Sequence, residues 1–216
     1  MPDKRDTLNR ILDSGITAVI RAKSSEHLIG VVEAIKAGGV ECIEVTMTTP
    51  NALAVISEAA RRFGHEAVIG VGSVLDAETC RAAILAGAEF VVGPTLDLGV
   101  IEMCRTYSKP VIPGALTPTE ILTAWRAGAD LVKVFPAGVV GPGYFRDVLA
   151  PLPQVKLVPT GGVDLSTAGD FIKAGAAALC VGSAMTPKDA MAEGKWDVLT
   201  DLAGKFVQAV KSARGG

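Results

Sequence analysis

Few of the 216 residues belong to the types that build metal and redox sites. The chain has two histidines, His27 and His65, and both lie in polar surroundings, so a histidine-based metal site has almost no material. The four cysteines show no CxxC spacing and lie among apolar residues, which is typical of core thiols in a reducing compartment; they are Cys42, Cys80, Cys104 and Cys180. We therefore expect no metal and no other cofactor.

An excess of charge of one sign is also missing. Lysine and arginine number 21 and aspartate and glutamate 23, so the formal net charge is -2 and no basic field would attract nucleic acid or an anionic membrane. No apolar run approaches the length of a membrane span, and no basic-then-apolar targeting segment opens the sequence. We expect a soluble cytoplasmic protein with no nucleic-acid or membrane partner.

Aromatic residues are scarce at 5%, whereas apolar residues make up 49% and glycines number 24. Proteins of the α/β class use this mixture for close packing of helices on a sheet. Four segments repeat a helix end, an Ala-Gly-Gly or Ala-Gly-Ala step and a short apolar strand: 34–45, 82–94, 123–136 and 171–183. We expect one glycine of each segment to cap its helix in the left-handed conformation: Gly38, Gly87, Gly128 and Gly175.

Short apolar segments alternate with helical ones along the chain. We predict eight strands, over 16–21, 41–46, 67–72, 89–94, 109–113, 131–136, 155–160 and 178–183. Predicted helices include 24–38 and 117–128, and the second begins with a Thr-Pro-Thr-Glu start signal. Further helices are predicted over 4–14 and 196–213.

This alternation predicts an α/β fold, namely a single parallel (β/α)8 TIM barrel with an extra N-terminal helix, in one domain over residues 1–216. The alternative is an open doubly wound sheet, which would need fewer strands or a glycine-rich dinucleotide turn. The segment GVGSV at 70–74 resembles such a turn only weakly, because the third glycine is missing.

A lysine, Lys133, interrupts the apolar segment LVKVFP at 131–136. Side chains on barrel strands alternate between interior and exterior, and this alternation predicts that Lys133 faces the interior. By the same rule Glu44 and Arg21 point inward near the ends of their strands, where barrel enzymes hold their catalytic groups. We expect these three charged side chains to converge.

A buried ion pair of Lys133 and Glu44 is the structural interpretation of this pattern, although such pairs are often close to neutral for stability. The functional interpretation is that burial and a nearby cation lower the pKa of Lys133 and leave a neutral amine that attacks a carbonyl, while the carboxylate moves protons. Lys156 also lies in an apolar segment, but it stands at the start of its strand, away from the catalytic end. We expect its side chain to reach water.

Two loops with glycine follow the last two predicted strands, PTGG at 159–162 and VGS at 181–183. Barrels commonly bind phosphate with these two loops, through backbone N–H groups and a short helix N-terminus. Gly161 and Gly162 let the backbone approach the oxygens, and Ser183 adds a hydroxyl donor. Ordinary loop glycines are the alternative interpretation.

Taken together, these residues resemble the family of 2-keto-3-deoxy-6-phosphogluconate (KDPG) aldolases and 4-hydroxy-2-oxoglutarate (KHG) aldolases. The matching motifs occur in family order and cover nearly the whole predicted barrel. They are AVIRA (18–22), IEVTMTTP (43–50), GVGSV (70–74), GPTLD (93–97), IPGALTPTE (112–120), LVKVFPA (131–137), PTGGV (159–163) and VGSAM (181–185). Each motif alone is weak, but the combination is specific.

The resemblance implies a homotrimeric class I aldolase that needs no metal. Lys133 matches the lysine that forms the Schiff base, and Glu44 matches the general acid/base. The resemblance assigns substrate binding to Arg21, Thr48, Ser73, Pro94, Phe135 and Thr160. It assigns phosphate binding to Gly161, Gly162, Gly182 and Ser183.

Among these positions, Arg21 matches an arginine that contacts anionic substrate groups, and Phe135 and Pro94 match residues that pack against the pyruvyl portion. Two positions depart from the family pattern. Thr48 stands where some members have an arginine that helps to hold the substrate carboxylate, and Ser73 stands where many have threonine. We expect the carboxylate to be held here by Arg21, or by Thr48 and nearby backbone donors, with the Ser73 region helping to orient it. Both departures leave the Schiff-base chemistry in place and bear on substrate preference.

The implied reaction is cleavage of KDPG to pyruvate and glyceraldehyde 3-phosphate, with KHG as a second substrate that yields pyruvate and glyoxylate. The galactonate epimer of KDPG would fit the same phosphate site. Two other classes stay open. One is a phosphosugar isomerase, epimerase or synthase that uses the same barrel without an imine, and the other is a non-catalytic barrel that serves assembly or binding.

Overall fold

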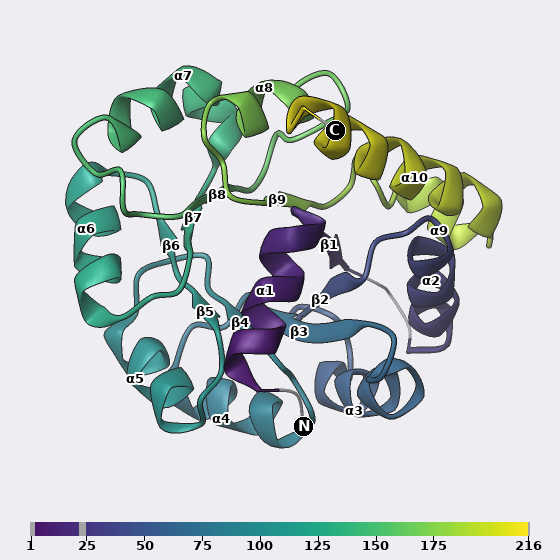
Figure 1. Cartoon of the computed structure of the whole chain (residues 1–216). Helices are drawn as coiled ribbons and strands as arrows, with labels where there is room; N and C mark the ends of the chain where they lie inside the picture. The colour runs from purple at the N-terminus through teal and green to yellow at the C-terminus, as the bar shows by residue number, and fades with distance from the viewer. Residues whose placement is uncertain (1–2, 22–24, 216) are drawn as a thin grey trace.

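In the computed structural model, residues 3–21 and 25–215 are described. Short strands and helices alternate along this part of the chain, and every strand pair is parallel. Figure 1 shows the helices arranged around the strands. The expected α/β alternation is therefore confirmed. Two expectations reach outside the described residues, at Ala22 of the motif 18–22 and at Ser24 of the predicted helix 24–38.

The strands form two parallel sheets. The larger sheet contains β1 (Ile16–Ile20), β2 (Cys42–Thr46), β3 (Val68–Gly72), β4 (Val91–Val92), β5 (Val111–Ile112) and β9 (Leu179–Val181), in the order β5-β4-β3-β2-β1-β9. The smaller contains β6 (Gly114–Ala115), β7 (Val132–Val134) and β8 (Leu157–Pro159), in the order β6-β7-β8. A single parallel bridge between Thr160 and Cys180 joins the end of β8 to β9. The strands thus curl into a half-barrel arrangement.

The prediction of a single strand over 109–113 needs a correction. The structure has two short strands there, β5 and β6, one on each side of Pro113. Proline has no N–H to donate to a neighbouring strand, so it interrupts the ladder. The carbonyl of Pro113 still accepts a hydrogen bond of 2.9 Å from the backbone N–H of Lys133. The two sheets therefore meet at this proline.

The helices have the following bounds: α1 (Lys4–Ser14), α2 (Ser25–Ala37), α3 (Ala52–Phe63), α4 (Ala77–Leu85), α5 (Leu98–Thr106), α6 (Pro118–Ala127), α7 (Ala137–Leu149), α8 (Ala168–Lys173), α9 (Lys188–Ala192) and α10 (Trp196–Ala213). The expected first and last helices have the bounds of α1 and α10. The start signal of α6 forms a capping box, in which Thr117 and Glu120 bond to each other's backbone N–H. Helix α7 has a kink at Gly141.

Three of the four glycines predicted to cap helices have positive φ: Gly87 at 112°, Gly128 at 101° and Gly175 at 100°. The prediction for Gly38 is wrong, because the residue with positive φ there is Gly39, at 91°. Gly38 instead lies against α10, where a Cβ would come within 2.5 Å of Ala203 Cβ and of the Thr200 carbonyl oxygen. The first glycine of this pair therefore serves helix packing and the second serves the turn.

Two apolar clusters lie on opposite sides of the curled sheets. The larger lies between strands and helices and includes Val132 and Val134. The smaller lies on the concave side and contains Ile11, Val19, Cys42, Val68, Phe90, Val92, Ile112, Leu131, Val158, Ala178 and Cys180. Its residues come from the alternate positions of the strands, as the sequence predicts. The cluster also contains Ile11, which lies on α1.

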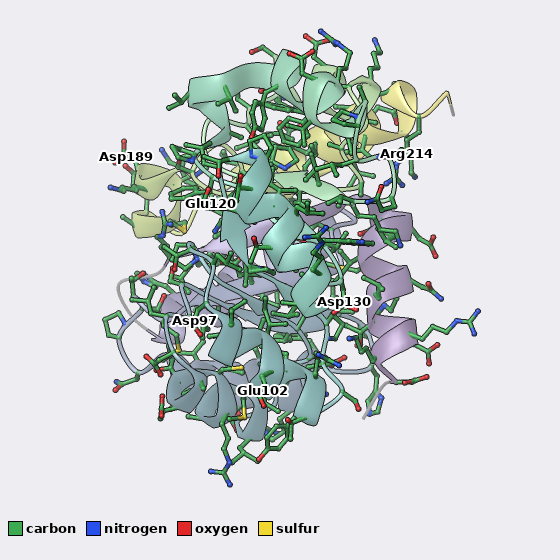
Figure 2. All side chains as sticks on the ribbon, turned by 90° about the vertical axis from the view of Figure 1, so that its left-hand side faces the viewer. Asp97, Glu102, Glu120, Asp130, Asp189 and Arg214 are labelled. Carbon is green, nitrogen blue, oxygen red and sulfur yellow. The ribbon has the colours of Figure 1, made fainter. Side chains whose placement is uncertain are left out.

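Helix α1 covers one end of the molecule. Arg214 donates hydrogen bonds of 2.8 Å to the carbonyl oxygens of Leu12 and Asp13, and Lys4 forms a salt bridge of 2.9 Å with Asp130. Figure 2 shows Arg214 and Asp130 near this end, and Asp97, Glu120 and Asp189 toward the opposite one. The opposite end is where the strands finish and the helices begin. In the described part of the chain, no helix is both long and apolar enough to span a membrane.

Candidate active site

Lys133 lies in the middle of β7 and is only 5% exposed. Its neighbours Val132 and Val134 pack toward the helices, while Leu131 belongs to the concave cluster. This alternation turns the Lys133 side chain to the concave side, as expected. Its Nζ lies 4.9 Å from the ring centroid of Phe135. The amine is therefore held in a largely apolar setting, beside an aromatic face.

Glu44 lies on β2 and is 1% exposed. Burial raises the pKa of this carboxyl above its ordinary value, and the positive charges of Lys133 and then Arg21 oppose that rise. The Glu44 Oε2 atom has no hydrogen-bond partner within the described residues. Lys133, Glu44 and Arg21 are thus close enough to influence one another, and Glu44 keeps a proton to higher pH than an exposed glutamate does.

A cavity of about 100 Å³ opens beside this group. It is lined by Val19, Arg21, Phe135, Thr160, Gly161, Gly162, Val163, Cys180, Gly182, Ser183 and Ala184. Seven of these residues are among the positions assigned from the sequence to substrate or phosphate binding: Arg21, Phe135, Thr160, Gly161, Gly162, Gly182 and Ser183. The cavity therefore gathers residues from β1 and β9 and from the segments that follow β1, β7, β8 and β9.

The loop after β8 needs its glycines for conformational and steric reasons. Gly161 and Gly162 have φ of 80° and 77°, in the left-handed region. A Cβ on Gly162 would also lie 2.6 Å from the Cα of Gly138, at the start of α7. Together with Gly182 and Ser183, these residues bring backbone groups and one hydroxyl to the cavity, beside the guanidinium of Arg21.

Lys133 and Glu44 are not in the cavity lining, and neither are three further predicted residues. The Thr48 Oγ1 lies 2.9 Å from Thr46 Oγ1. Ser73 follows β3 with φ 59°, an uncommon conformation for a residue other than glycine. Pro94 is half-buried after β4. Phe135, a lining residue, is what connects the cavity to Lys133, and these three residues lie in loops or turns outside the lining.

Cys180 is a lining residue, although its apolar sequence context predicts only a place in the core. All four cysteines are free and buried, as expected for core thiols. Cys180 also lines the cavity, and burial raises the pKa of its thiol to about 12, so it stays protonated. Alternation in the segment 178–183 puts Ala178 and Cys180 on the concave face, and this pattern could have indicated that Cys180 lies near the cavity.

The other polar residues singled out in the sequence lie away from this group. Lys156 is exposed just before β8, as expected. His27 and His65 are exposed too, and His27 stacks edge-on against Trp196 at a centroid distance of 6.3 Å. Within residues 3–21 and 25–215, no group of three or more His, Cys, Asp or Glu side chains is arranged to hold a metal ion.

A buried amine next to a carboxyl group of raised pKa can form and break a carbon–nitrogen bond with a carbonyl compound, because the carboxyl group supplies and removes the protons. The adjacent cavity has one guanidinium and several backbone donors, which suit an anionic group. The arrangement is thus chemically suited to a phosphorylated carbonyl substrate.

Residues 8–202 match the family model described as KDPG and KHG aldolase. The 2-dehydro-3-deoxy-phosphogluconate aldolase of Treponema pallidum (strain Nichols) is 33% identical over 196 residues, which cover 90% of this chain and 93% of that protein. The KHG/KDPG aldolase of Escherichia coli (strain K12) is 32% identical over 214 residues, 98% of this chain and 100% of that protein.

One solved structure similar to this chain is a KDPG aldolase from Legionella pneumophila with pyruvate captured as a covalent carbinolamine intermediate. It has a TM-score of 0.86 and 26% identity, and the match covers 92% of this chain and 96% of that one. Fold, sequence and family model agree over most of the chain. The chain therefore belongs to the KDPG and KHG aldolase family.

Proposed function

We propose that this chain is a class I aldolase that cleaves KDPG to pyruvate and glyceraldehyde 3-phosphate, with KHG as a second and smaller substrate. The observation that supports it most directly is the buried amine of Lys133 beside the buried carboxyl of Glu44, whose pKa is raised. Membership of the family and the pyruvate carbinolamine of the Legionella relative agree with this chemistry.

In the first half of the proposed reaction, neutral Lys133 Nζ attacks the C2 ketone of the substrate. A carbinolamine forms, and the protonated Glu44 donates a proton to the departing hydroxyl, which leaves as water. The product is a protonated imine, and its positive nitrogen draws electrons from the neighbouring C3–C4 bond. The raised pKa of Glu44 suits this step, because a proton donor must be protonated near the working pH.

In the second half, the Glu44 carboxylate removes the proton of the C4 hydroxyl. The C4–O bond becomes a carbonyl, the C3–C4 bond breaks, and its electron pair moves through C3 and C2 to the imine nitrogen. The aldehyde leaves, and the remaining enamine takes a proton back at C3. Water then attacks the imine carbon, pyruvate is released, and Lys133 is again a free amine.

The cavity would hold the far end of the substrate. The backbone donors of Gly161, Gly162 and Gly182 would bind the phosphate, with the Ser183 hydroxyl as a further donor. Because Arg21 lines the same cavity as these loops, it would bind the phosphate and not the carboxylate that the sequence predicts for it. Thr48 and Ser73 stand near the ends of β2 and β3, and would take part in holding the carboxylate where some family members use an arginine. Binding of the remote phosphate contributes orientation, not bond chemistry.

We further propose that the two sheets close into one (β/α)8 barrel, in a single domain over residues 1–216. The bridge between Thr160 and Cys180 at one seam and the chain continuity through Pro113 at the other support this closure. A cytoplasmic homotrimer completes the proposal. The trimer rests on the family resemblance, and the compartment on four free cysteines of the kind found in reducing surroundings.

Trapping with borohydride tests the imine chemistry. The protein is incubated with pyruvate and sodium borohydride, digested and mapped by peptide mass spectrometry. We expect a reduced pyruvyl adduct on Lys133 and none on Lys156, which is exposed. A phosphosugar isomerase, epimerase or synthase on the same fold would give no adduct, and that result would overturn the proposal.

Substrate order is tested by the rates of pyruvate release from three compounds: KDPG, its galactonate epimer and KHG. The cavity beside Arg21 predicts faster turnover of the two phosphorylated compounds. A much faster rate with KHG would contradict the phosphate assignment but leave the imine chemistry intact.

A further inference from the structure

Strand β3 lacks a side chain at two positions of its concave face, Gly70 and Gly72. In the parallel register, Gly70 pairs with Glu44, and Gly72 pairs with Thr46, two residues closer to the end of the strand. Neither glycine has a left-handed φ. The backbone conformation of β3 therefore does not require glycine at either position, and the reason for these residues is the space above them.

The space at Gly72 is filled by the carboxyl group of Glu44. A Cβ on Gly72 would lie 1.6 Å from Glu44 Oε1, 2.3 Å from Cδ and 2.7 Å from Cγ. No real Cβ contact is this short, so even a methyl group at position 72 cannot coexist with the carboxyl group in its present position.

The space at Gly70 is filled by a different group. A Cβ there would lie 2.3 Å from Cε1 of the Phe90 ring and 2.4 Å from its Cζ. Phe90 is fully buried in the concave cluster. The two glycines of β3 thus make room for two neighbouring groups, an apolar ring at Gly70 and the Glu44 carboxyl group at Gly72.

Glu44 is enclosed in the interior of the protein. Its side chain is 1% exposed, and Cys42 on the same face of β2 is 0% exposed. A methyl group at position 72 would therefore push the carboxyl group out of its position relative to Lys133. Close-packed interiors transmit such displacements instead of absorbing them.

We propose that Gly72 is a positioning residue of the aldolase reaction, because its missing side chain provides the space that holds the carboxyl group of Glu44 beside Lys133. The inference deepens the proposed function and rests on it for its catalytic meaning. Gly72 acts through Glu44, and it has no group that could take part in the chemistry itself.

The effect on catalysis follows from geometry. Displacement of a catalytic group by about 1 Å can cost roughly 100-fold in rate. The steps that use Glu44 as a proton donor or acceptor should be the most sensitive. With pyruvate alone, one such step is the exchange of methyl protons through the enamine, which proton NMR follows in deuterated water.

The first experiment compares Gly72→Ala with Gly70→Ala, which adds the same methyl group to the same strand. We expect Gly72→Ala to slow methyl exchange by roughly 100-fold while prolonged borohydride treatment with pyruvate still labels Lys133. Gly70→Ala displaces Phe90 and should slow exchange much less at a similar unfolding temperature. An unchanged exchange rate in Gly72→Ala, or an equal loss in Gly70→Ala, would overturn the proposal.

The second experiment combines Gly72→Ala with Glu44→Ala, which removes Cγ, Cδ and both carboxyl oxygens. The three atoms that the methyl group would meet are then absent. We expect the exchange rate of the double variant to exceed the product of the two single effects by about tenfold or more. The unfolding temperature of the double variant should also lie above that of Gly72→Ala.

This thermal comparison decides the matter even where Gly72→Ala does not fold. Recovery of folding by Glu44→Ala supports the proposal, and failure to recover it overturns the proposal. The comparison is also independent of the proposed function. Absence of any pyruvate adduct in the wild-type protein would remove the aldolase assignment, whereas coupling between positions 44 and 72 would still be measured in the unfolding temperatures.

Discussion

The Nζ atom of Lys133 lies 4.9 Å from the ring centroid of Phe135, two residues further along the chain. Lys133 is 5% exposed, whereas Phe135 is 36% exposed and lines the cavity. The backbone after the ring turns at a cis bond to Pro136. The ring is thus both a neighbour of the amine and part of the cavity wall.

This contact predicts that Phe135→Leu lowers activity. The aromatic face would stabilise the protonated imine that forms on Lys133 by about 0.5–2 kcal/mol, depending on how far the site is desolvated. We expect kcat/KM for KDPG to fall by roughly 2- to 30-fold, which is that energy expressed as a rate ratio. Steady-state kinetics measure it. A variant as active as wild type would show that the ring contributes nothing to the reaction.

Replacement of the proposed Schiff-base lysine should abolish cleavage. Lys133→Ala removes the amine that would attack the ketone, and we expect activity to fall by at least about 1,000-fold with the circular dichroism spectrum unchanged. Lys156→Ala is the matched control, because this lysine is exposed before β8. It should retain full activity, and equal losses in the two variants would contradict the assignment.

Glu44→Gln should separate activity from stability. Burial raises the folded-state pKa of Glu44 above its ordinary value of about 4.5, so its contribution to stability is present below that pH and is lost as pH rises through the folded pKa. Wild type should therefore lose stability relative to Glu44→Gln from about pH 4.5 upward.

Thermal unfolding from pH 4 to pH 8 measures this difference. At pH 7 to 8 the inactive Gln variant should have the higher midpoint, by roughly 2–4 °C for each kcal/mol of relief. The two curves should converge toward pH 4. A gap that widens as pH falls would mean that the folded state lowers the pKa of Glu44.

Arg21→Ala tests the phosphate side of the cavity. Arg21 is the cationic residue among the lining side chains, and charge-assisted hydrogen bonds to an oxyanion are the strong ones. We expect KM for KDPG to rise by roughly tenfold or more, as the loss of about 1.4 kcal/mol or more of binding would give. KM for KHG, which has no phosphate, should change less.

The same experiment distinguishes the two anionic groups of the substrate. An equal rise of KM for both substrates would instead assign Arg21 to the carboxylate that KDPG and KHG share. Arg214→Ala is a control of equal charge change, because Arg214 binds the backbone of α1 at the other end of the molecule (Figure 2). It should leave both KM values unchanged.

Several features of this protein follow from local sequence patterns alone. The bounds of α1 and α10 agree with the predicted helices, and the capping box at Thr117 begins α6 where the Thr-Pro-Thr-Glu signal indicates. Alternation along the strands also predicted that Lys133 and Glu44 share the concave side. Helix caps and two-residue periodicity involve neighbours in the chain, so the residues themselves contain this information.

Tertiary contacts decided what local patterns leave open. Gly38 packs against α10, a helix more than 150 residues away, and so the left-handed turn falls on Gly39. The fifth predicted strand is split at Pro113 because proline has no N–H to donate to a neighbouring strand. Which strands are its neighbours is set by the tertiary structure. The roles of Arg21, Thr48, Ser73 and the other assigned site residues stay predictions.

The amino-acid sequence by itself determined the family, the alternation of elements and the face on which each charged side chain lies. Only the tertiary structure decided where the cavity lies, that Cys180 lines it, and that Glu44 occupies the space above Gly72. The physical reason is that periodicity acts between chain neighbours, whereas space is set by the register and packing of strands that are distant in the sequence.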